Sequence, residues 1–166
     1  LFDLQGFLVV KGFLSNTEIT TLNAAIDANL DKCKEHVGGG EGPNLTGAHR
    51  RGLYEGMLTW EQPWCKGFRE LLAHTQLVPY LNTFFGRGWK LDHSPNIITA
   101  TQGAEGLNLH GHGNVQFNAS RFYTHHNGRM RCGLVNCQFY LSDVGPDGWR
   151  PMYNPRQPQG QLPLSG

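Results

Sequence analysis

Two histidines, His110 and His112, are the residues of this sequence whose type and spacing point most directly to chemistry. They stand two residues apart in the segment 107–113, between two stretches of strand-like composition. On an extended backbone, residues at i and i+2 project to the same side of the strand. Two imidazole nitrogens on one side of a strand make half of a transition-metal site. The pattern predicts metal binding; two solvated loop histidines are the open alternative, because the motif is short.

A second chemical signal is the alternation of residue types along 134–143. Apolar side chains occupy one face of this predicted strand, and Asn136, Gln138 and Tyr140 occupy the other. Amide and phenol groups suit a partly enclosed cavity that hydrogen-bonds a ligand. An ordinary solvent-exposed face is the alternative interpretation.

The size and charge of the chain limit the classes of function. Its 166 residues suffice for one domain with a substantial core. The formal net charge is +1 and no block of like charges occurs, which argues against a nucleic-acid groove or a polybasic membrane patch. No apolar run approaches the roughly 18 residues that a membrane span needs. We therefore expect neither a nucleic-acid partner nor a membrane partner.

The first residues and the cysteines indicate the setting of the protein. The chain opens at Leu1 without an initiator Met or a basic segment, so we expect no signal peptide and a piece of a longer chain. Its four cysteines form no C-x-x-C pair. Reduced, structural thiols in a cytoplasmic protein are the expectation.

The elements that must position these side chains begin with a predicted strand at 7–14. Ser15 and Glu18 match a capping box. Apolar residues then recur every three or four positions as far as Val37, which predicts an amphipathic helix ended by the glycines at 38–40. The segment 41–60 is predicted to be irregular.

The rest of the chain changes from helical to strand-like patterns. Helices are predicted at about 61–74, with Pro63 in the first turn, and at about 76–85, ending at Gly86. Strands are predicted at 89–93, 96–101, 107–112 and 134–143, and 114–130 is predicted to be a polar excursion with a turn at Asn127-Gly128. Helices first and strands later predict a mainly β, α+β fold: a jelly roll with helices packed outside it.

Several blocks of the sequence, taken in order, resemble the phytanoyl-CoA dioxygenase family of Fe(II)- and 2-oxoglutarate-dependent oxygenases. The blocks are 7–15, Leu-Asp-His-Ser-Pro at 91–95, Glu-Gly-Leu-Asn-Leu-His-Gly at 105–111, and Asn-Gly-Arg-Met-Arg-Cys-Gly-Leu at 127–134 followed by Leu-Ser-Asp at 141–143. The resemblance covers residues 1 to about 148. It implies a double-stranded β-helix domain over 1–148, whose C-terminal part is incomplete, and a tail at 149–166 that reads as disordered.

The resemblance also implies an iron site and departs from the family within it. The family holds iron with an H-x-D pair and a distant second His, and His110 stands at the first position. His112 stands where the family has its acid. Two interpretations of His112 stay open: it is a third nitrogen ligand, as in cupin-like sites, or its side chain points away from the metal. Gln138 and Tyr140 become candidates for lining the 2-oxoglutarate pocket.

A second departure follows Asp143. The family continues with a strand reading roughly Gly-Gly-Phe-Cys-x-Ile-Pro-Gly-Ser-His-Lys, which supplies the distal His. Here no His follows His126, and four prolines between 151 and 163 are incompatible with a central strand. The residues at 148–163 can be encoded by codons that, when translated in the frame one base later, give Ala-Gly-Gly-Leu-Cys-Thr-Ile-Pro-Gly-Ser-His-Lys-Ala-Asn-Phe. We therefore hypothesise a frameshift near residue 146.

The expected function is thus that of a dioxygenase of this family acting on a small molecule, with weak or no activity in this polypeptide. No catalytic residue is assigned beyond the metal ligands. Two alternatives remain: a cupin-like metal enzyme that does not use 2-oxoglutarate, and a non-catalytic jelly-roll binding module. The substrate would be set by loops such as 41–60 and 113–130.

Overall fold

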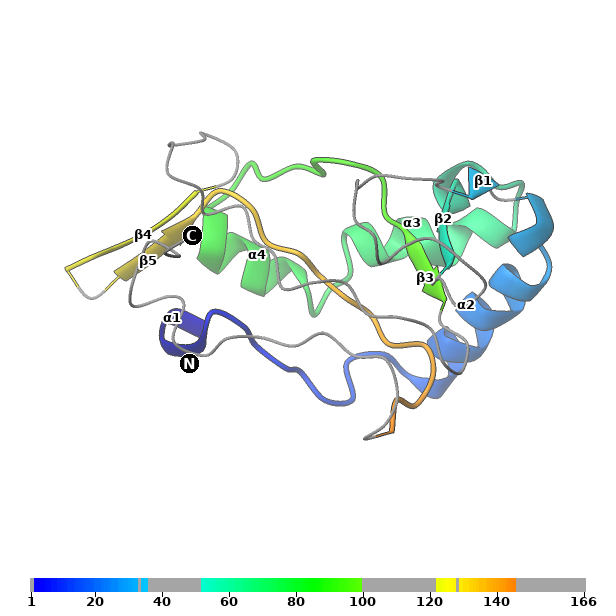
Figure 1. Cartoon of the computed structure of the whole chain (residues 1–166), viewed down its shortest axis with the longest axis horizontal. Coiled ribbons are helices and arrows are strands. Elements are labelled where there is room, and N and C mark those ends of the chain that lie inside the picture. The colour runs from blue at the N-terminus through cyan, green and yellow to red at the C-terminus, as the bar shows by residue number, and fades with distance from the viewer. Residues whose placement is uncertain (1, 33, 36–51, 100–121, 128, 146–166) are drawn as a thin grey trace, which may run out of the picture.

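The computed structural model describes residues 2–32, 34–35, 52–99, 122–127 and 129–145 (Figure 1). The helical elements are α1 (Phe2–Gln5), α2 (Asn16–Asp27), η1 (Leu30–Lys32), η3 (Met57–Thr59), α3 (Trp64–Leu72) and α4 (Val78–Phe85). The strands are β1 (Lys34–Glu35), β2 (Gly52–Glu55), β3 (Ile97–Thr99), β4 (Tyr123–His126) and β5 (Arg129–Cys132). Helices α2 and α3 lie with β1–β3 at one end of the molecule, and the β4–β5 ribbon lies at the other (Figure 1).

Helix α2 begins with the predicted capping box. The Ser15 and Glu18 side chains each accept a hydrogen bond from the other residue's backbone N–H, at 3.3 and 2.7 Å. These two bonds satisfy N–H groups that the first turn of a helix leaves without partners. The prediction of a helix start at this point is confirmed.

The predicted C-terminal end of α2 is wrong, because the helix ends at Asp27 and not near Val37. Asn29 is buried, and its side-chain Nδ2 donates to the carbonyl of Ala25 at 2.9 Å. The Asn29 backbone N–H instead donates to the carbonyl of Ile26. A side chain has thus replaced the i→i−4 backbone donor, which is how Asn competes with a helix.

The core lies where α2, η3 and α3 meet. Its buried residues come from these elements and the residue after η3; they are Leu22, Ala25, Met57, Trp60, Cys65 and Phe68. The Trp60 and Phe68 rings pack edge to face, with their centroids 5.4 Å apart. Gly67 lets the helices approach closely, because a Cβ built there would lie 3.0 Å from Leu22 Cδ2.

The segment 41–60, predicted to be irregular, contains a strand and a helical turn in its described part. Strand β2 is the centre of an antiparallel sheet with the order β1-β2-β3. The predicted strand at 96–101 is confirmed as β3, whereas the predicted strand at 89–93 is wrong. Residues 57–60 are ordered because Met57 of η3 and Trp60 are buried in the core.

Helices α3 and α4 lie within their predicted ranges. Pro63 precedes the first residue of α3, at the N-cap. Helix α4 ends at Gly86, whose φ of 77° is a conformation that favours glycine. These two predictions are confirmed.

Strands β4 and β5 form an antiparallel ribbon inside the segment predicted to be a polar excursion. Asn127, at the tip, has a φ of 51°, as the first residue of an Asn-Gly hairpin turn does. The predicted turn is confirmed, and the excursion is corrected to a hairpin over its described part.

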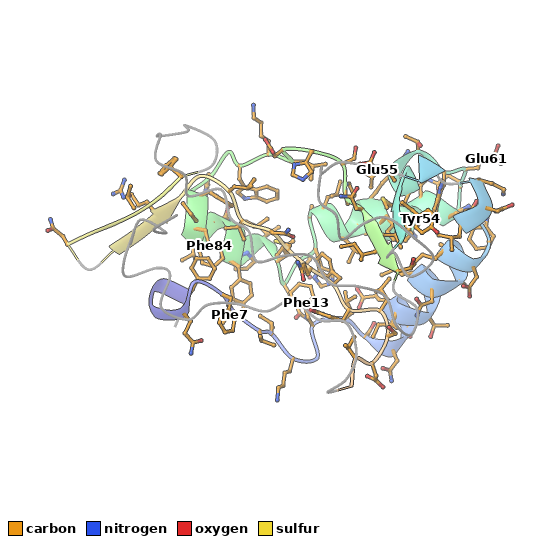
Figure 2. The ribbon with its side chains drawn as sticks, viewed as in Figure 1. Phe7, Phe13, Tyr54, Glu55, Glu61 and Phe84 are labelled. Atoms are coloured by element: carbon orange, nitrogen blue, oxygen red, sulfur yellow. The ribbon has the colours of Figure 1, made fainter. Side chains whose placement is uncertain are left out.

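The predicted strands at 7–14 and 134–143 pair with no strand among the described residues. Aromatic contacts hold both segments instead. Phe13 packs on Phe139 with ring centroids 5.6 Å apart and on His74 at 4.8 Å. Figure 2 labels Phe7 and Phe13 along the N-terminal segment and Phe84 beside it.

The two small sheets do not by themselves make a jelly roll. The strand predicted at its centre, 107–112, lies outside the described residues, and so does the tail at 149–166. The jelly roll therefore stays a prediction. In the part of the chain that the structure describes, no helix is both long and apolar enough to cross a bilayer.

Candidate functional site

The predicted metal ligands His110 and His112 lie outside the described residues. Within the described ranges, no three His, Cys, Asp or Glu side chains are grouped so that they could hold a metal ion. A metal site built from such ligands would therefore need at least one donor from the remaining segments, which include 100–121. The prediction that His110 and His112 bind a metal stays a prediction.

The segment 134–143 forms no strand and keeps the predicted alternation in part, since Cys137, expected on the apolar face, is exposed. Val135, Phe139 and Leu141 are partly buried. Gln138 and Tyr140, on the other side, are exposed, and Tyr140 keeps 49% of its surface accessible. Both predicted cofactor-binding residues are thus accessible to a ligand. Their role in binding a cofactor stays a prediction.

Contacts with the N-terminal part of the chain fix the end of this segment. Asn23 Nδ2, on α2, donates to the Leu141 carbonyl at 2.8 Å, and the Leu141 side chain packs against the core. Phe139 is held by Phe13 as described above. Burial raises the pKa of the Cys137 thiol, although the residue as a whole is exposed. A raised pKa makes this thiol a poor nucleophile.

A polar cluster in the described residues joins Ser15, Glu18 and His74. Ser15 donates to Glu18 Oε2 from its hydroxyl at 2.6 Å and from its backbone N–H at 2.7 Å. His74 Nε2 lies 3.0 Å from Glu18 Oε1. The Ser15 bonds, with a smaller contribution from His74, lower the pKa of Glu18 from 4.5 to about 2. The cluster connects the start of α2 to the residues that follow α3.

This cluster has a serine, a carboxylate and a histidine, yet its geometry does not suit nucleophilic catalysis. Ser15 donates to the carboxylate and not to the imidazole, whereas a serine nucleophile needs a base that accepts its proton. A carboxylate with a pKa of about 2 is too weak a base for that role. His74 Nδ1 accepts the Gln76 backbone N–H at 3.3 Å. Both imidazole nitrogens are therefore engaged in holding the fold.

His93 is paired with its neighbour in sequence, Asp92. Its Nδ1 lies 2.9 Å from Asp92 Oδ2, and 66% of the His93 side chain is exposed. The pair is on the surface and not in the core.

The roles of His74 and Asn23 were not predicted from the sequence. Their partners, Glu18 and Leu141, lie 56 and 118 residues away along the chain. Periodicity and local spacing report only on neighbours in sequence, so no pattern of that kind could have found these pairs.

No protein-family model matches this chain, and neither a curated protein nor a solved structure matches it significantly. The resemblance to the phytanoyl-CoA dioxygenase family thus rests on the sequence blocks alone and is carried forward as a proposal.

Proposed function

We propose that this chain is a domain of the phytanoyl-CoA dioxygenase type, with a metal site centred on His110 and with weak or no oxygenase activity. The observation that carries the proposal is the ordered set of blocks at 91–95, 105–111, 127–134 and 141–143. The helical N-terminal half and the anchored segment 134–141 support it, because they give the candidate cavity residues a fixed attachment to the core.

In this proposal iron(II) with 2-oxoglutarate supplies the oxidising chemistry when both are bound. His110 would hold the metal through one imidazole nitrogen, and Gln138 and Tyr140 would line the co-substrate pocket. The described residues alone do not fit the metal, and the sequence has no His beyond 126 to serve as the distal ligand. Weak retention of iron follows from this shortage of donors.

A cupin-like metal enzyme is a second candidate, favoured by one observation. His112 occupies the position at which the resembled family has a carboxylate. Imidazole pairs suit several divalent transition metals, and such a site would bind metal without 2-oxoglutarate. A comparison of metal binding with and without 2-oxoglutarate separates the two candidates.

Anaerobic titration with iron(II) tests the proposal. The weak visible charge-transfer band of an iron–2-oxoglutarate complex is expected to be faint or absent in the native chain and to strengthen in His112→Asp, which restores the H-x-D pair. It is expected to be strongest when His112→Asp is combined with replacement of 149–163 by the alternative-frame sequence. His125→Ala serves as the matched histidine control.

Two results would contradict the proposal. A strong band in the native chain at stoichiometric iron would refute the claim of weak activity. The absence of the band in the variant that combines His112→Asp with the replaced tail, when circular dichroism shows that variant to be folded, would refute the family assignment. Resequencing of the gene tests the frameshift separately, since an unbroken frame with matching peptide masses would end that hypothesis.

We also propose a cytoplasmic location and a small-molecule substrate. Cys65 and Cys137 are free thiols, as is usual in a reducing compartment. Redox-state labelling of these thiols in cells tests the location: trapping them as disulfides would contradict it.

A further inference from the structure

The ring of Phe13 contacts two other rings that come from distant parts of the chain. Its centroid is 4.8 Å from that of the His74 imidazole and 5.6 Å from that of the Phe139 ring. Both separations are typical of packed aromatic rings. Phe13 thus connects the residues that follow α3 with the segment 134–143.

The backbone on either side of Phe13 is well placed to hold its ring. Gly12 turns the chain immediately before Phe13, with a φ of 63° that favours glycine. Immediately after it, Leu14 packs against the core and Ser15 is the N-cap of α2. The position of Phe13 is therefore set by the start of α2.

Two hydrogen bonds fix the orientation of the His74 ring. The Glu18 carboxylate, whose pKa is lowered to about 2, is ionised at neutral pH and can only accept, so His74 Nε2 donates to Oε1, 3.0 Å away. The Gln76 backbone N–H donates to Nδ1 at 3.3 Å, so Nδ1 carries no proton. The neutral Nε2–H tautomer satisfies both contacts. Only 13% of the His74 side chain is accessible, which leaves the ring little room to turn away from Phe13.

Phe139 passes this support to the candidate ligand-binding residues. Gln138 and Tyr140 flank Phe139 in sequence and are exposed, whereas Phe139 is partly buried. Along an extended backbone, adjacent side chains point to opposite sides. A fixed Phe139 ring therefore fixes the side to which both of its neighbours point.

We propose that His74 is a positioning residue, which holds Phe13 against Phe139 and thereby keeps Gln138 and Tyr140 in place for a ligand. The identity of that ligand as 2-oxoglutarate rests on the function proposed above, whereas the coupling of His74 to 137–141 does not. The plain alternative is that His74 only stabilises the turn between α3 and α4. That role needs the two hydrogen bonds of His74 and not its ring contact.

Alkylation of two thiols in the purified chain, without ligand, tests the coupling. Cys137 is two residues from Phe139, and burial raises the pKa of its thiol, whereas Cys65 is 1% exposed in the core. Opening of 137–141 uncovers the first thiol alone, and global unfolding uncovers both. Iodoacetamide labelling measured by peptide mass spectrometry gives the ratio of the two rates. His74→Ala is expected to raise this ratio about tenfold.

Further variants separate the ring contact from the hydrogen bonds. His74→Phe keeps a ring beside Phe13 and should restore most of the slow labelling, whereas His74→Gln keeps a donor for Glu18 and should label as fast as His74→Ala. In a Phe13→Ala background, His74→Ala should add no further increase, because the two residues act in series. His93→Ala, a change at an exposed histidine paired with Asp92, is the matched control and should leave the ratio unchanged.

Three results would overturn the coupling: an unchanged ratio in His74→Ala, rescue by His74→Gln and not by His74→Phe, or additive effects of His74→Ala and Phe13→Ala. Circular dichroism checks that each variant is folded, and His74→Gln supplies the same comparison if His74→Ala does not fold.

The consequence for a ligand is measured separately. In the variant that combines His112→Asp with the replaced tail, His74→Ala should raise the 2-oxoglutarate concentration that gives half of the charge-transfer band. An unchanged concentration, together with faster labelling of Cys137, would overturn the role in ligand placement. Absence of the band with and without His74→Ala would refute the proposed function, while the labelling result would still decide the coupling.

Discussion

The two ends of this molecule are built differently. At one end, α2, η3 and α3 pack six buried side chains into a core. Packing alone accounts for the residue types found there. At the other end, the β4–β5 ribbon is a two-stranded element with exposed polar and basic side chains at Thr124 and Arg131. An isolated two-stranded hairpin is at best marginally stable in water. The ribbon therefore depends on its attachment to the rest of the protein.

This difference separates stability from chemistry. The helical core is built from buried apolar side chains, whereas Gln138 and Tyr140, the described residues to which we assign binding, are exposed. The extended segment 134–141 joins the two, because it leaves the ribbon and ends on α2 at Asn23 (Figure 1). Changes in the core should therefore destabilise the protein, and changes at Gln138 or Tyr140 should alter binding with little effect on folding.

The largest effect on stability is expected for Met57→Ala. Met57 is 1% exposed in the core, and truncating such a side chain leaves a cavity that costs about 2–5 kcal/mol. Urea denaturation followed by circular dichroism measures the loss. Lys66→Ala, exposed on α3, is the control and should change stability by less than about 0.5 kcal/mol. Equal losses of stability in Met57→Ala and Lys66→Ala would contradict the assignment of Met57 to the core.

A smaller effect is expected for Ser15→Ala at the start of α2. The loss of this N-cap should cost about 0.5–2 kcal/mol. The same cluster makes stability depend on pH. Since folding lowers the pKa of Glu18 from 4.5 to about 2, its contribution is complete well above pH 4.5 and is lost as the pH falls from there through 2.

Glu18→Gln isolates that pH dependence from the other carboxylates. The difference in unfolding free energy between the native chain and Glu18→Gln should be constant above about pH 5.5 and shrink steadily below the unfolded pKa of 4.5. Denaturant titrations at a series of pH values measure it. A difference that grows toward low pH would mean that the folded protein raises, and does not lower, the pKa of Glu18.

The smallest effect on global stability, about 0.5–1.5 kcal/mol, is expected for Asn23→Ala. This change removes the hydrogen bond to the Leu141 carbonyl. Relative to the native chain, hydrogen exchange measured by mass spectrometry should be faster in 138–145 of the variant and unchanged in α3. Uniform acceleration over both regions would contradict the idea that Asn23 serves mainly to hold this segment, and Asn16→Ala, exposed at the start of α2, is the control.

Local signals in the sequence predicted local features well. The capping box at Ser15, the helix end at Gly86 and the turn at Asn127 each depend on residues within a few positions, and each is present. The end of α2 was missed, because Asn29 competes for a backbone carbonyl only where its side chain is buried. Burial is a property of the tertiary structure and leaves no periodic mark.

Strands were harder to predict from the sequence than helices. The alternation in 134–143 correctly gave the side that is partly buried, but a strand also needs a hydrogen-bonding neighbour, and among the described residues this segment has none. Conversely, β2 lies in a segment whose composition gave no strand signal, and its pairing with β1 and β3 provides the order. The candidate metal ligands were read from spacing alone and remain predictions.

The claim that His110 is a metal ligand is tested most directly by metal stoichiometry. The native chain, His110→Ala and His125→Ala would each be dialysed against limiting iron(II) without oxygen, and bound iron would be measured by mass spectrometry. We predict substoichiometric iron in the native chain and in His125→Ala, and none in His110→Ala. Equal iron in all three, with all three folded, would contradict the account.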